Sequence, residues 1–175
     1  MQIPLSYFFV RPFMIARIAV GALLPLSVAW AGMSDSISAP GETAVATFHA
    51  EGAQIYACKA NAAGQLSWQF REPVATLLDG DKTVGRHYAG PQWELADGSA
   101  VEARVSARAS GTTPQDIPLL RLDVSARRGA GLLADVTTIQ RINTRGGVAE
   151  GACATAGAMM SVPYAADYVF LKKAH

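Results

Sequence analysis

Apolar and polar residues alternate along much of the chain beyond Gly41, and this is the pattern of half-buried β-strands. In Val101–Arg108 every odd-numbered position is apolar and every even-numbered position is polar, and Leu120–Arg127 repeats the alternation. One face of such a strand packs inward while the other meets water. Runs rich in β-branched and aromatic residues predict further strands at Gln54–Lys59, Leu66–Phe70, Val74–Leu78, Val84–Tyr88, Gln92–Ala96 and Val162–Leu171.

Clusters of Gly, Pro, Asn and Asp separate these runs and predict turns. Asp97-Gly98 indicates a hairpin, Glu72-Pro73 a turn, and the two prolines of Ser110–Pro118 a surface loop. Thr137–Thr144 fits a helix face as well as a strand, and its β-branched residues favour the strand. We therefore expect one all-β domain, an antiparallel β-sandwich or β-barrel with a long loop and little helix.

The first 31 residues have the features of an export signal. Arg11 and Arg17 precede the apolar run Ile18–Val28, which ends in Ala29-Trp30-Ala31, with small residues where a signal peptidase cuts. An uncleaved anchor is the alternative, although the run is shorter than the twenty or so residues of a spanning helix. We expect cleavage after Ala31, a flexible lead over residues 32–46, a single β-rich domain over residues 47–173, and no stable membrane insertion of the mature protein.

Composition narrows the function classes. Half of the residues are hydrophobic and 17 % are charged, which excludes an intrinsically disordered chain. The net charge is +1 and the basic residues form no long runs, so the sequence lacks the basic patch that is typical of nucleic-acid-binding proteins. The only cysteines, Cys58 and Cys153, lie in the part that would be exported to the periplasm or the extracellular space. In an oxidising compartment they are expected to form a disulfide, with two separate thiols as the alternative.

Several short motifs resemble cofactor or metal sites but do not support one. Gly129–Ala134 matches a dinucleotide-binding pattern, but too few residues follow for the βαβ units of such a fold, so we interpret it as a turn. Asp79-Gly80-Asp81 lacks the further ligands of a calcium loop. His49, His87 and His175 are far apart in the sequence, which indicates no metal site. No cofactor is expected.

Two stretches could build a binding site. The first contains His87, Tyr88, Trp93 and Glu94 around a Gly-Pro turn, which could form a pocket with aromatic walls and a carboxylate, or simply a hairpin with buried aromatics. In the second stretch, Arg141 and Asn143 would project from one face of a strand. There they could hold a carboxylate or close a buried hydrogen-bond network.

Several strings in order resemble one known family. They are Gly52–Cys58, Pro73–Asp79, His87–Glu94 with Asp97–Ser99, Ile139–Thr144 with Gly146-Gly147, and Val162–Tyr168. Together they resemble the domain of unknown function 3455, from about Thr47 to Leu171. The resemblance implies a small exported domain without an established activity.

These observations lead to three functional hypotheses. The first is a non-enzymatic binding module for a small molecule or glycan, because a β scaffold with clustered aromatics can bind but offers little catalytic chemistry. The second is an extracytoplasmic enzyme that uses His87 as acid or base with Glu94. The third is a structural or assembly protein that binds another envelope protein.

Overall fold

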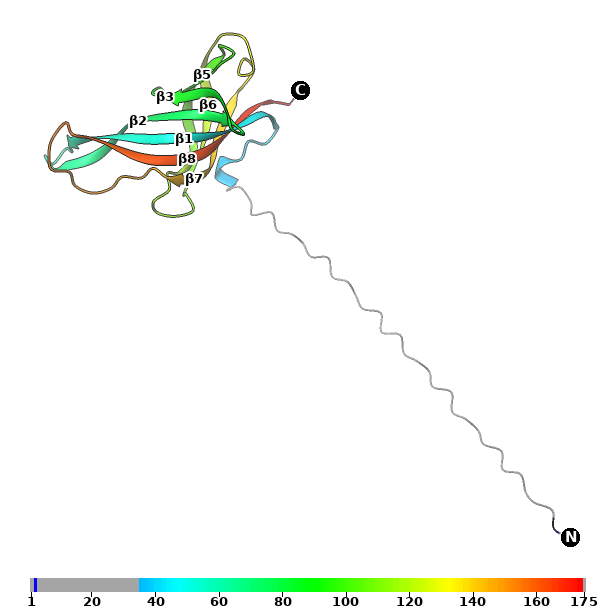
Figure 1. Cartoon of the computed structure of the whole chain (residues 1–175), viewed down its shortest axis with the longest axis horizontal. Helices are drawn as coiled ribbons and strands as arrows, with labels where there is room; N and C mark the ends of the chain where they lie inside the picture. Colours follow the sequence, from blue (N-terminus) through cyan, green and yellow to red (C-terminus); the bar gives the residue numbers. More distant parts are fainter. Residues whose placement is uncertain (1, 3–34, 175) are drawn as a thin grey trace. The chain divides into compact units, whose positions relative to one another are not determined.

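The computed structural model describes residue 2 and residues 35–174, so the predicted export signal lies outside the described residues. Eight antiparallel strands follow one another around a closed barrel, each paired with its neighbours in sequence, and the last strand pairs with the first. Figure 1 shows this arrangement. The strands are β1 (Glu42–Ala60), β2 (Leu66–Asp79), β3 (Lys82–Tyr88), β4 (Gln92–Leu95), β5 (Ala100–Ala109), β6 (Leu119–Arg128), β7 (Thr138–Gly146) and β8 (Met159–Lys173). The all-β prediction is confirmed, and the open choice between sandwich and barrel resolves as a barrel.

The largest difference from the predicted elements lies in β2. A turn was expected at Glu72-Pro73, whereas β2 runs through it, with Glu72 paired to Ile55 and Pro73 paired to Gln54. A register shift between Ile55 and Tyr56 leaves Arg71 as the extra residue of a β-bulge. A bulge next to a proline accommodates the missing backbone N–H within a sheet, so here Pro73 does not end the strand.

Residues 35–46 belong to the segment that was expected to be a flexible lead. In the structure these residues are part of the folded domain. A short 3₁₀ helix, η1 (Asp35–Ile37), precedes β1, and β1 itself begins at Glu42. The side chain of Ile37 is fully buried, and its carbonyl accepts a hydrogen bond from Gln140 Nε2 at 2.7 Å. This segment therefore covers Gln140 on the outside of β7.

The barrel has one closed end and one open end. Leu133 and Val136, from the loop between β6 and β7, are both fully buried in the apolar core with Phe48, Leu77 and Phe170. This loop contains the Gly129–Ala134 motif and forms turns and bends, as predicted. It plugs the barrel at that end.

At the other end a disulfide joins β1 to the long loop between β7 and β8. Cys58 and Cys153 are bonded and are 95 residues apart in the sequence, which confirms the predicted pair. Backbone hydrogen bonds hold the same loop against the β1–β2 hairpin, from Trp68 N to Gly151 O and from Cys153 N to Leu66 O. In Figure 1 this hairpin extends past the barrel with the loop beside it. Such a bond is compatible with an exported protein.

Candidate functional site

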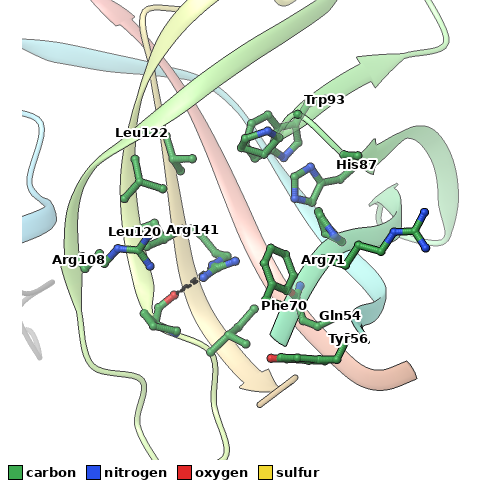
Figure 2. A pocket seen from close by; sticks show the side chains of 17 residues that line it. Gln54, Tyr56, Phe70, Arg71, His87, Trp93, Arg108, Leu120, Leu122 and Arg141 are labelled. Atoms are coloured by element: carbon green, nitrogen blue, oxygen red, sulfur yellow. Dashed lines mark hydrogen bonds between the residues drawn. The ribbon is translucent and has the colours of Figure 1, made fainter. Parts of the chain in front are cut away.

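A cavity of about 440 Å³ occupies the open half of the barrel. Its wall comes from β1 to β7 and from the loops between β3 and β4 and between β5 and β6. Its lining residues include Gln54, Tyr56, Phe70, Arg71, His87, Trp93, Arg108, Leu120, Leu122 and Arg141. Figure 2 shows their side chains around the space. Phe70 is 53 % exposed and Val105 38 %, so the cavity reaches solvent past an apolar rim.

The strand alternation divides the predicted His87–Glu94 cluster between two faces of the barrel. His87 pairs with Trp93 across the β3–β4 hairpin, and both side chains are buried inside. Their rings stack with centroids 4.3 Å apart and an interplanar angle of 11°. Both residues line the cavity.

Tyr88 and Glu94 lie on the outer face instead, and neither lines the cavity. Glu94 accepts hydrogen bonds from Tyr88 Oη at 2.8 Å and forms ion pairs with Arg128 and Arg86. The hydrogen bond from Tyr88, followed by those from Arg128 and Arg86, lowers the pKa of Glu94 to about 2. The predicted pocket carboxylate is therefore a surface residue in an ion-pair cluster, and it does not meet His87.

His87 is electrically neutral at ordinary pH. Its pKa is lowered to about 3, chiefly by burial; the hydrogen bond to the Gln92 carbonyl opposes this shift in part, and the charge of Arg141 adds to it. That bond joins His87 Nδ1 and Gln92 O at 2.8 Å. Because a carbonyl only accepts, Nδ1 carries the proton and Nε2 is left as a hydrogen-bond acceptor.

Arg141 is the most unusual residue of the cavity. It is only 9 % exposed, and its Nε and Nη2 both donate to the Pro118 carbonyl, at 3.0 and 2.8 Å. In Figure 2 the side chain points into the space between Leu120 and Phe70. Within residues 35–174 it forms no ion pair with a carboxylate.

Asn143 does not share the face of Arg141, contrary to the prediction. A register shift between Ile142 and Arg145 distorts β7, and Asn143 adopts a positive φ of 51°. Its side chain donates a hydrogen bond to Asp167 Oδ2 at 2.7 Å on the outside of the barrel. A bulge changes the facing of the residues beyond it, which the sequence pattern did not indicate.

The cavity also contains polar atoms without a partner in the described part of the chain. Gln54 Nε2 and Trp93 Nε1 are both buried and make no hydrogen bond there. Sequence reasoning missed Gln54, Tyr56, Phe70, Arg71 and Arg108, because only closure of the barrel brings β1, β2 and β5 to the same space. The sequence signal that could have found them is the alternation of inward-facing and outward-facing residues along each strand.

Two further observations concern metals and membranes. Within the described residues no group of three or more His, Cys, Asp or Glu side chains is placed to hold a metal ion. No helix in that part of the chain is long and apolar enough to cross a membrane.

Comparison with known proteins gives one match. The family model described as Protein of unknown function (DUF3455) matches residues 39–172, and this confirms the resemblance found in the sequence. Neither the curated proteins nor the solved structures contain a match.

Proposed function

The chain belongs to the DUF3455 family, whose description gives no activity, and we propose that it is an exported, non-enzymatic module that binds a small molecule inside its barrel. The site is the open cavity that contains His87, Trp93 and Arg141. The proposed location is the periplasm or the extracellular space.

The observation that carries this proposal is the cavity with its partnerless donors. A volume of about 440 Å³ lies within the usual range for small-molecule sites. A buried donor without an acceptor costs roughly 1–3 kcal/mol, so Gln54 Nε2 and Trp93 Nε1 favour an occupant that accepts hydrogen bonds. The exposed apolar rim formed by Phe70 and Val105 suits the entry of a partly apolar molecule.

The geometry favours a small molecule over a glycan. Sugars bind well to an open aromatic face, whereas Trp93 is stacked on His87 and meets Tyr168 edge-on at 5.2 Å. With an exposure of 1 %, Trp93 also belongs to the core. Its replacement would test stability as well as binding, so Trp93 is a poor probe of function.

The enzymatic alternative receives less support from the arrangement. It pairs His87 with Glu94, which lie on opposite faces of the β3–β4 hairpin. A buried imidazole whose pKa is about 3 is also a weak general base at neutral pH. Recruitment of another envelope protein remains the third hypothesis, and co-purification of a stoichiometric partner with an empty cavity would favour it.

The test uses a neutral apolar fluorophore, N-phenyl-1-naphthylamine, with protein freed of bound molecules on an apolar resin. Val105→Trp should obstruct the cavity at its rim, and Val74→Trp is the matched control, because Val74 is 53 % exposed and does not line the cavity. We expect saturable one-to-one binding by the wild type and the control, weakened roughly tenfold or more in Val105→Trp. Equal binding by all three, or no binding by folded protein, would contradict the proposal.

A further inference from the structure

All charged side chains in the cavity lining are positive. Arg71, Arg108 and Arg141 are among the lining residues, and Asp and Glu are absent from that lining. His87 adds no charge, because burial keeps it neutral. The space is therefore positive, and the positive group inside it, as opposed to those at the rim, is Arg141.

Arg141 retains donors that the protein does not use fully. A guanidinium has five N–H groups, and the Pro118 carbonyl takes one from Nε and one from Nη2. The guanidinium also interacts with the Tyr168 hydroxyl, whose pKa is raised by burial. A cation removed from water needs a partner of opposite charge to offset its lost hydration. Within residues 35–174 no carboxylate takes that role.

The rest of the wall is mainly apolar. Leu120, Leu122, Ile117 and Phe70 line the cavity together with Arg141. A planar guanidinium matches a carboxylate in shape, and one buried positive charge balances one negative charge. A phosphate would carry more charge than one buried arginine balances, and the other two arginines of the lining, Arg71 and Arg108, are exposed to solvent.

We propose that the cavity binds a monocarboxylate with an apolar body, and that the carboxylate sits against Arg141. This inference rests on the proposed function, because it requires an occupied cavity. The body of the ligand lies against Phe70, Leu120 and Leu122. Further oxygen atoms on the ligand satisfy Gln54 Nε2 and Trp93 Nε1.

The first test needs only the wild-type protein. Calorimetry at pH 7.5 compares 2-naphthoate, 2-naphthol and 2-naphthylmethylamine, which share one ring system and differ in charge. Hydrogen bonds to a charged group contribute about 1.5–3 kcal/mol, so we expect 2-naphthoate to bind roughly ten- to hundredfold more tightly than 2-naphthol, with the amine weakest. Equal affinity for naphthoate and naphthol would overturn the inference while leaving the proposed function intact.

The second test assigns the preference to a residue. Arg141→Met should abolish the preference for naphthoate, so that the ratio of naphthoate affinity to naphthol affinity falls to about one, whatever loss of the contacts with Pro118 does to the affinity for neutral N-phenyl-1-naphthylamine. Arg104→Met removes a positive charge from an exposed position outside the cavity and should leave both affinities unchanged. Ile117→Ala disturbs the loop that carries Pro118 without removing charge, so it should weaken all probes alike.

The outcomes separate the two proposals. Equal loss of naphthoate and neutral probe in Arg141→Met would show that Arg141 only positions the loop, and would overturn the inference. Failure of the neutral probe to bind folded wild-type protein would overturn the proposed function, and the inference with it. Selective loss of naphthoate in Arg141→Met, with Arg104→Met unchanged, is the result that supports the carboxylate site.

Discussion

The buried, unprotonated state of His87 should make the folded protein less stable at mildly acidic pH than at neutral pH. The folded-state pKa of His87 is lowered to about 3 from its ordinary value of 6.5. The folded protein therefore stays unprotonated at this site between these two pH values, while the unfolded chain takes up a proton. Stability from this group is complete above pH 6.5 and is lost as the pH falls toward 3.

The magnitude follows from linkage. Between pH 7.5 and pH 5.0 the preferential protonation of the unfolded chain should lower the free energy of unfolding by about 2 kcal/mol. His87→Gln removes this contribution, and an amide can still donate to the Gln92 carbonyl that His87 contacts. The comparison stops at pH 5.0 because Glu94 adds its own pH dependence below that point. The pKa of Glu94 is lowered to about 2, so its contribution to stability is lost as the pH falls from 4.5 toward 2.

Urea unfolding followed by tryptophan fluorescence at the two pH values measures the effect. The wild type should lose about 2 kcal/mol more than His87→Gln over this interval, whatever the difference between them at pH 7.5. Titratable groups common to both proteins cancel in this comparison. Equal losses in the two proteins, or an imidazole proton of His87 that titrates near 6.5 in NMR spectra, would refute the burial argument.

Two further predictions concern the ends of the barrel. Replacing both Cys58 and Cys153 with Ser should lower the free energy of unfolding by roughly 4–5 kcal/mol, because their bond closes a loop of 95 residues; denaturant titration checks this, and reduced wild type that matches oxidised wild type would contradict it. Leu133→Ala should cost about 2–5 kcal/mol, since Leu133 is fully buried in the plug. Leu132→Ala is its neighbouring control, with an exposure of 45 % and an expected change within about 0.5 kcal/mol. Similar thermal shifts for the two leucine variants would show that the loop does not plug the barrel.

Local patterns predicted most of the strands because each alternates between an inner and an outer face. Tyr164, Ala166, Tyr168 and Phe170 occupy alternate positions of the last strand, and all four are buried in the core. The error at Pro73 has a physical reason, since a bulge lets a strand pass through a residue that normally ends one.

The candidate site was harder to predict, because neighbours in sequence are not neighbours around a cavity. In a strand, consecutive residues face opposite sides. His87 and Trp93 therefore entered the cavity while Tyr88 and Glu94 turned outward, although the sequence presents them as one cluster. A bulge then separated Asn143 from Arg141. Bulges and barrel closure depend on distant pairing, which the local pattern does not contain.

The hydrogen bonds at the open end bear on how the cavity can bind. Tyr56 Oη donates to the Gly147 carbonyl at 2.7 Å, and Asp116 Oδ1 accepts from Gly146 N. Together with the bonds from Arg141 to Pro118, they attach the loops around the opening to the barrel strands. All of these contacts are made within the chain itself, so the walls of the proposed site are preformed. A preformed site avoids much of the entropy cost of ordering loops, and the affinity then reflects how well a ligand satisfies the polar atoms already in place.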